Sequence, residues 1–257
     1  MTLAALVPAV GDGRGQQARQ RKLFQLLDGL PVLTHALDRL EQCPKIDHIY
    51  PIVAPDDLSY VQEHILIPGR YQKVADVLVG GLLRQDYITR ALVQLGPRYD
   101  LVMIHDGSRP LVSQELLLKV IEAGEVHGAA VASVPMHDTL KTISREYFIT
   151  SSFERRRLRA IQTPQVFRYD ILNRAHLQAS RENFYGSDEA QLIERIGERI
   201  RVVTGSHLNI YVATREDLVL AHALLRSERE IKAIGNTGSG GSDGGSRHER
   251  EKERGNS

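Results

Sequence analysis

The fold is decided by the opening stretch Leu3-Ala-Ala-Leu-Val-Pro-Ala9 and the loop after it, Val10-Gly-Asp-Gly-Arg-Gly15. The first part is an apolar run with the length of a buried strand, and the second is a glycine-rich turn. Glycines let backbone N–H groups approach phosphate oxygens closely. Positive charge surrounds the turn at Arg14, Arg19, Arg21 and Lys22. The stretch predicts a strand leading into a phosphate-binding loop, with a purely structural turn as the alternative.

The rest of the chain repeats this arrangement of strand and loop. Residues 46–53, 101–104, 129–134 and 200–203 are apolar, branched runs of strand length, and residues 31–40, 114–123 and 189–196 have helical periodicity. The alternation predicts an α/β domain whose sheet is mostly parallel and Rossmann-like, with helices on both faces. Such sheets bind nucleotides and other ligands beyond the carboxyl ends of their strands, so the loops after the strands form the candidate site.

Residues 138–167 break the alternation. Two extended segments flank Arg145-Glu146, and a basic run follows at residues 155–159. We expect a β-hairpin arm over about 138–162, whose basic run is either a solvated face or an anion-binding or dimer contact. Thr214, with Asp217 three residues later, predicts the N-cap of a last helix ending near Lys232. A single domain would thus span 1–232, and the Gly/Ser-rich, then charged, residues 235–257 are expected to be disordered.

Composition limits the classes of partner. The 257 residues carry a formal net charge of +1, which gives no field for nucleic acid. No apolar run is long enough to span a membrane, and the start lacks the basic region of a signal peptide. The single cysteine, Cys43, excludes an intrachain disulfide. We expect a cytoplasmic protein with neither nucleic-acid nor membrane partners.

The loop His105-Asp-Gly-Ser-Arg-Pro110 directly follows the predicted strand 101–104. An aspartate at the carboxyl end of a strand is well placed to hold Mg²⁺, so Asp106 is the candidate metal ligand. Capping of the helix that starts near Ser113 is the alternative role for Asp106. Arg109 could pair with Asp106 or with a substrate phosphate.

Other loops add polar groups without an evident nucleophile–base pair. Gly80-Gly81, ahead of Arg84, suits a base or ribose, and Ser187-Asp-Glu-Ala190 is typical of a helix N-terminus, which accounts for Glu189. Neighbouring side chains such as His105 and Asp106 point to opposite faces of a strand. This favours a transfer in which a substrate oxygen attacks while the protein positions groups and neutralises charge.

Taken in order, the loops resemble the 2-C-methyl-D-erythritol 4-phosphate cytidylyltransferase family over about residues 3–226. The resemblance rests on His105-Asp-Gly-Ser-Arg-Pro110, Asp138-Thr-Leu-Lys141, Gln162-Thr-Pro-Gln-Val-Phe167, Ser187-Asp-Glu-Ala190, and Asn209-Ile210 with Arg215-Glu-Asp-Leu218. It implies that CTP and 2-C-methyl-D-erythritol 4-phosphate react, with Mg²⁺, to form 4-(cytidine 5'-diphospho)-2-C-methyl-D-erythritol and pyrophosphate for isoprenoid synthesis. It also implies a homodimer formed through the arms.

The resemblance assigns roles to single residues. It implies catalysis by Lys22 and Arg14; nucleotide binding by Ala9, Val10, Gly11, Gly13, Gly81 and Asp106; Mg²⁺ binding by Asp106; and acceptor binding by Arg109, Thr139, Arg155 and Thr163. The chain differs from the family at Gly15 and Tyr211, where cations are expected, and at Tyr87, where a serine is expected.

These differences keep two alternatives open: a cytidylyltransferase for another polyol phosphate such as ribitol phosphate, and a catalytically degenerate nucleotide-binding dimer. An NAD-dependent enzyme is disfavoured, because the third glycine of its fingerprint and the acidic residue after its second strand are missing.

Overall fold

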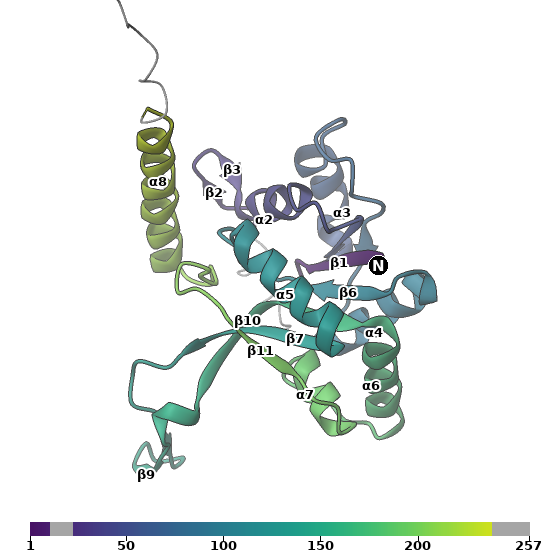
Figure 1. Cartoon of the computed structure of the whole chain (residues 1–257), viewed down its shortest axis with the longest axis vertical. Helices are drawn as coiled ribbons and strands as arrows, with labels where there is room; N and C mark the ends of the chain where they lie inside the picture. The colour runs from purple at the N-terminus through teal and green to yellow at the C-terminus, as the bar shows by residue number, and fades with distance from the viewer. Residues whose placement is uncertain (11–22, 238–257) are drawn as a thin grey trace, which may run out of the picture.

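The computed structural model describes residues 1–10 and 23–237, which form a seven-stranded sheet between layers of helices (Figure 1). The strands are ordered β11-β7-β10-β6-β1-β4-β5. The bounds are β1 Leu3–Pro8, β4 His48–Val53, β5 Leu78–Val79, β6 Leu101–Ile104, β7 Ala129–Pro135, β10 Arg159–Arg168 and β11 Arg201–Thr204. β1 pairs in parallel with β4 and β6, and β7 pairs in parallel with β11. The mostly parallel sheet predicted from the sequence is confirmed.

Helices cover both faces of this sheet, as predicted. Alternate side chains of β1 point to opposite faces, so Leu3, Ala5 and Val7 join one buried cluster and Ala4 and Leu6 the other. The first cluster includes residues of α2 (Val32–Glu41) and α5 (Gln114–His127). The second includes residues of α4 (Arg84–Leu95), α6 (Tyr169–Arg181) and α7 (Glu189–Arg195). Because helices bury both faces of the sheet, a ligand can reach it only at the loops that follow the strands.

The strand β10 corrects the predicted end of the arm, because residues 159–162, assigned to the arm, belong to the main sheet. It lies between β6 and β7, antiparallel to both, in the middle of the sheet. Its register shifts between Gln162 and Gln165, at the Thr163-Pro164 pair. Proline cannot donate a hydrogen bond to a neighbouring strand, which is why it is found at bulges when it occurs inside a sheet. Because of the proline and the basic residues, the local sequence pattern does not predict a central strand here.

The arm itself is present over the predicted residues. β8 (Lys141–Ile143) and β9 (Ile149–Ser152) pair antiparallel as a separate two-stranded sheet. This hairpin projects well beyond the main sheet (Figure 1). A short 3-10 turn, Arg155–Arg157, then leads into β10. The arm is therefore an extension of the strands that line the site, β7 and β10.

The last helix, α8 (Arg215–Thr237), begins where the sequence predicted. The Asp217 amide donates to Thr214 Oγ1 at 3.1 Å, and the Thr214 amide donates to Asp217 Oδ2 at 2.7 Å, a reciprocal capping box. α8 continues through Thr237 rather than ending near Lys232, and the predicted tail beyond it lies outside the described residues. Within the described ranges, no helix has the length and apolarity needed to cross a membrane.

The strands β2 (Leu26–Leu27) and β3 (Leu30–Pro31) form a small hairpin ahead of α2. Leu27 and Val32, beside this hairpin, pack with Ala221 and Leu225 of α8. The segments 55–57, 58–60 and 61–65 form short helical turns after β4, and Gly96–Arg98 extends α4 as a 3-10 turn. Of these peripheral elements, the turns after β4 pack on the first buried cluster through Leu58, Val61 and Ile65.

Candidate active site

The loops after β1 and β6 are held together by the backbone. The His105 amide donates to the Leu6 carbonyl and the Gly107 amide to the Pro8 carbonyl, each at 3.0 Å. A Cβ on Gly107 would lie 2.7 Å from Leu33 Cδ1 and 3.2 Å from the Pro8 oxygen, closer than packed atoms allow. A side chain at Gly107 would force Leu33 to move, so glycine favours this close docking of the Asp106 loop on the end of β1.

The centre of the site is a chain of charges through Asp106, Arg84 and Glu189. Arg84 Nη1 donates to Asp106 Oδ1 at 2.8 Å, while Nε and Nη2 donate to the two carboxylate oxygens of Glu189, each at 3.2 Å. The Glu189 side chain is only 2% exposed. A buried carboxylate needs such a partner, since an unpaired charge in the interior is very costly. Glu189 therefore fixes the guanidinium that in turn holds Asp106.

Asp106 keeps its charge in this surrounding. Burial alone would raise the pKa of its carboxyl, but Arg84 and Arg109 outweigh burial and hold the pKa below its usual value. Arg109 Nε lies 3.8 Å from Asp106 Oδ2. Asp106 is therefore an ionised carboxylate at the carboxyl end of β6. The suggestion that it caps the following helix is wrong, because Ser113 is the N-cap, its hydroxyl accepting from the Leu116 amide at 3.1 Å.

A second, uncharged chain holds the backbone of Asp106. The Asp106 amide donates to Thr163 Oγ1 at 3.0 Å, and that hydroxyl lies 3.4 Å from His105 Nδ1. His105 Nε2 lies 3.1 Å from the Arg109 carbonyl oxygen and so carries the proton that this bond needs. Burial lowers the pKa of His105 to about 4, which keeps the ring neutral. Thr163, predicted to bind acceptor, lies behind Asp106 on β10 and positions its loop.

Arg109 is held by the segment after β11. Its Nη1 donates to the Asn209 carbonyl at 2.7 Å, and its guanidinium carbon lies 5.4 Å from the centre of the Tyr211 ring. Asn209 is buried and donates to the Thr163 carbonyl at 2.8 Å. No described residue accepts a hydrogen bond from the buried Arg109 Nε. Arg109 is therefore held beside Asp106 by Asn209 and Tyr211, with its buried Nε 3.8 Å from Asp106 Oδ2.

The other predicted residues fall into four groups. Ala9 and Val10 directly follow β1; the Ala9 amide donates to the Ile52 carbonyl at 2.8 Å, and Val10 packs on Gly80. Gly81 lies where a Cβ would be 2.6 Å from Arg90 Nη2. Thr139 and Arg155 are exposed at the base of the arm, where Arg155 Nη1 donates to the His137 carbonyl at 2.5 Å. Gly11, Gly13, Arg14, Gly15 and Lys22 lie outside the described residues.

The sequence analysis missed the pairing of Arg84 with Glu189. Asp188 does cap α7, accepting from the Gln191 amide at 3.0 Å, so the helix start was right. The conclusion that the start of a helix accounts for Glu189 was wrong, because its carboxylate is buried against Arg84, 105 positions away. The available signal was a charged residue at an apolar helical position, since Ala190, Leu192 and Ile193 around it are all buried.

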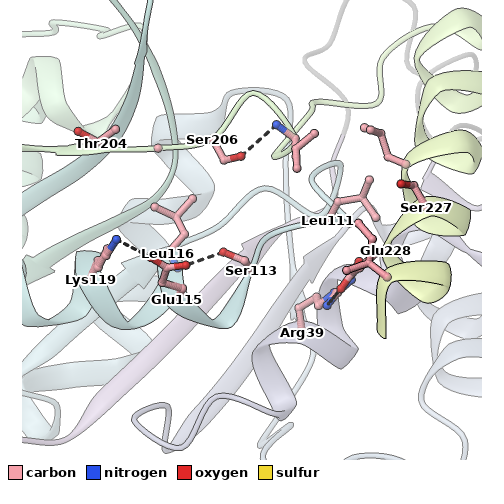
Figure 2. Close-up of a pocket in the computed structure, with 14 residues that line it drawn as sticks. Arg39, Leu111, Ser113, Glu115, Leu116, Lys119, Thr204, Ser206, Ser227 and Glu228 are labelled. Carbon is pink, nitrogen blue, oxygen red and sulfur yellow. Dashed lines mark hydrogen bonds and ion pairs between the residues drawn. The ribbon is translucent and has the colours of Figure 1, made fainter. Parts of the chain in front are cut away.

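A cavity of about 520 Å³ opens elsewhere, between α2, α5, α8 and the segment after β11 (Figure 2). The ion pair between Arg39 and Glu228 crosses it, and Lys119 pairs with Glu115 on its wall. Among the described residues, none of the predicted site residues lines this cavity. The converging loops around Asp106, rather than this cavity, are the candidate active site.

Comparison with known proteins agrees with this geometry. The family model described as IspD, 2-C-methyl-D-erythritol 4-phosphate cytidylyltransferase, matches residues 3–227. The chain belongs to this family. It is 39% identical over 226 residues to the enzyme of that name from Syntrophus aciditrophicus, covering 88% of this chain and 97% of the relative. The relative from Pelotomaculum thermopropionicum is 36% identical over 227 residues, covering 88% and 95%.

Solved structures of the cytidylyltransferase family share the fold. The 4-diphosphocytidyl-2C-methyl-D-erythritol synthase of Anaerococcus prevotii superposes with a TM-score of 0.76 at 27% identity, covering 88% of this chain and 96% of that one. The 2-C-methyl-D-erythritol 4-phosphate cytidylyltransferase of Thermus thermophilus gives a TM-score of 0.70 at 29% identity, covering 86% and 98%. The Rossmann-like fold and the family resemblance drawn from the loops are confirmed.

Proposed function

We propose that the chain transfers CMP from CTP to 2-C-methyl-D-erythritol 4-phosphate, as the names of its relatives indicate. An oxygen of the acceptor phosphate attacks the α-phosphorus of CTP, a new P–O–P bond forms, and the bond to the β-phosphate breaks to release pyrophosphate. The observation that carries the proposal is an ionised Asp106 with the Arg109 guanidinium held beside it at the end of β6.

The protein's share of this reaction is to position groups and balance charge. Asp106, fixed by Arg84 and by the Thr163 hydroxyl, keeps one orientation at the nucleotide. Arg109, held in place by Asn209 and Tyr211, binds the acceptor phosphate through its guanidinium, because a guanidinium donor suits a phosphate oxygen. Lys22 and Arg14 remain the predicted cations at the triphosphate. Preorganised charges of this kind stabilise charge as it develops in the transition state.

The donors present fit Mg²⁺. In the described part of the chain no three His, Cys, Asp or Glu side chains are grouped to hold a metal. Mg²⁺ commonly needs only one or two carboxylates, because substrate phosphates and waters supply the remaining ligands. Asp106 would hold the ion, whose chemistry is to neutralise phosphate charge.

We also propose that the enzyme works in the cytoplasm as a homodimer through the hairpin arm. The arm carries bulky apolar side chains in water: Tyr147 is 85% exposed, Phe148 72% and Ile149 67%. Apolar side chains gathered on a projecting hairpin are costly in a monomer and typical of an interface. Thr139 and Arg155 at its base would then lie near the partner, consistent with their predicted role in acceptor binding.

Tyr211 favours one alternative, a different polyol phosphate as acceptor. Its ring stacks on Arg109, at a position where the resemblance expects a cation. A stacked tyrosine keeps the guanidinium oriented but adds no charge. Turnover of ribitol phosphate with CTP, at a higher kcat/KM than the methylerythritol phosphate, would establish this alternative.

Release of pyrophosphate from CTP tests the proposal directly. The purified full chain is assayed with Mg²⁺, each of the four ribonucleoside triphosphates and a panel of polyol phosphates. We expect turnover with CTP and methylerythritol phosphate, and a loss of at least about 100-fold in kcat/KM in Asp106→Asn, since one preorganised charge is removed. Asp86→Asn, in an exposed acidic residue of α4, is the control and should leave the rate unchanged. CTP binding without turnover of any acceptor would instead show a degenerate nucleotide-binding protein.

A further inference from the structure

Two histidines from different segments meet at the base of the arm. His137 follows β7, and His207 lies in the segment after β11. Their Nε2 atoms are 3.0 Å apart, their ring centres are 4.7 Å apart, and the ring planes are inclined by 40°. Both side chains are exposed. They are distinct from the Asp106 site and take no part in the mechanism above.

The distances differ from those of a straight hydrogen bond. If one ring donated head-on to the other, the centres would be more than about 5 Å apart, since each ring adds its own depth to the N···N distance. The distance of 4.7 Å between the ring centres means that the rings are not aligned head-on. Both Nε2 atoms instead face a point to one side of the line that joins them. A metal ion would be bound through a ring-nitrogen lone pair of each imidazole.

This arrangement matches two neighbouring ligands of one metal ion. A divalent ion about 2.1 Å from each nitrogen, with an angle of about 90° between the bonds, holds the nitrogens about 3.0 Å apart. A tetrahedral ion needs about 3.4 Å, which a small rotation of either side chain supplies. Imidazole suits Zn²⁺, Ni²⁺ and Cu²⁺, whereas Mg²⁺ prefers oxygen.

The backbone of His137, and that of the two residues before His207, is held from outside the pair. The His137 carbonyl accepts from Arg155. On the other side, the Gly205 amide donates to the Ser133 carbonyl at 2.7 Å, and the Ser206 carbonyl accepts from Gln162 Nε2 at 2.9 Å. The two segments that carry the rings are therefore fixed by hydrogen bonds outside the pair, which lowers the cost of bringing the ligands together.

We infer that His137 and His207 form a binding site for a borderline divalent cation such as Zn²⁺ or Ni²⁺. The two imidazoles are its protein ligands, and water completes the coordination, since no third His, Cys, Asp or Glu joins them in the described part of the chain. The bound ion links the base of the arm to the segment that carries Asn209 and Tyr211. The bound ion therefore fixes the position of the arm relative to the Asp106 site.

Calorimetric titration of the chelator-treated full chain with Zn²⁺ alone, and separately with Ni²⁺ alone, tests this site. Excess Mg²⁺ is present to occupy carboxylates. We expect one histidine-dependent site per chain, and a rise in Tm because the ion binds the folded state. His207→Ala and His207→Gln should each weaken this binding by at least about tenfold, since one of two ligands is lost. His127→Ala, at an exposed histidine ending α5, is the matched control and should bind as the parent does.

Loss of binding in both His207 variants, with binding retained in His127→Ala, supports the site. Equal binding in the parent and the His207 variants would place the ion elsewhere and overturn the inference, as would no binding at all. Far-UV circular dichroism of each variant without metal checks that the fold is intact. The titration contains no substrate, so its result does not depend on the proposed reaction.

Discussion

Replacing Glu189 by glutamine probes the charge chain that holds Asp106. The change keeps the side-chain shape but removes the charge that Arg84 contacts at two oxygens 3.2 Å away. Breaking a buried ion pair typically costs about 3–5 kcal/mol. Arg84 is 31% exposed and keeps Asp106 as a partner, so we expect a loss of about 2–3 kcal/mol in the free energy of unfolding.

The same substitution should also change the use of metal. Without Glu189, Arg84 pairs more fully with Asp106 and competes with Mg²⁺ for the carboxylate. We expect the Mg²⁺ concentration for half-maximal pyrophosphate release to rise at least about tenfold, equivalent to about 1.4 kcal/mol. Urea unfolding and a Mg²⁺ titration of the initial rate measure the two effects.

Glu125→Gln is the matched control. Its carboxylate lies 2.8 Å from Lys45 Nζ in a partly exposed pair, for which a loss below about 1 kcal/mol is expected. If Glu189→Gln loses no more stability than this control, and its Mg²⁺ dependence is unchanged, Glu189 does not support Asp106 and the reasoning is refuted.

Three further predictions follow from packing, burial and exposure. Gly107→Ala would push a methyl group to 2.7 Å from Leu33 Cδ1, so we expect a loss of about 1–3 kcal/mol in urea unfolding and a displaced Asp106 loop with lower kcat. Burial lowers the pKa of both His105 and His176 to about 4. Between pH 6.5 and 4, therefore, the rings of the unfolded chain bind protons and those of the folded chain do not. As the pH falls through this range, the free energy of unfolding should fall by about 3 kcal/mol per histidine. An unfolding free energy that stays flat from pH 6.5 to 4.5 would contradict this. Phe148→Asp should convert the proposed dimer to a monomer in sedimentation without changing the circular dichroism; a parent chain that is already monomeric would contradict the interface.

The sequence predicted those features that depend on neighbours along the chain. The strand 101–104 matches β6 in both bounds, and Thr214 and Asp217 form the predicted capping box. Apolar periodicity and capping chemistry are local, so they can be read without knowledge of the fold. The arm was found for the same reason, because its alternating segments have turn residues between them.

The remaining features depend on contacts distant in sequence. Arg84 and Glu189 are 105 positions apart, and no spacing rule links them. β10 combines a basic start, a proline and a register shift, each of which argues locally against a central strand. It is a strand because β6 and β7 both pair with it. Tertiary contacts overrode the local signal, as they often do for strands.

β10 also has a mechanical consequence. One end of this strand pairs with β7 at Arg159 and continues into the arm, and a few residues along it Thr163 accepts the hydrogen bond of the Asp106 amide. A force applied at the hairpin therefore reaches Thr163 along the backbone through the turn Arg155–Arg157, and it passes from Thr163 to the Asp106 amide through one hydrogen bond. The arm and the candidate site share this piece of backbone, so a change in the length or anchoring of the arm would bear directly on the position of Asp106.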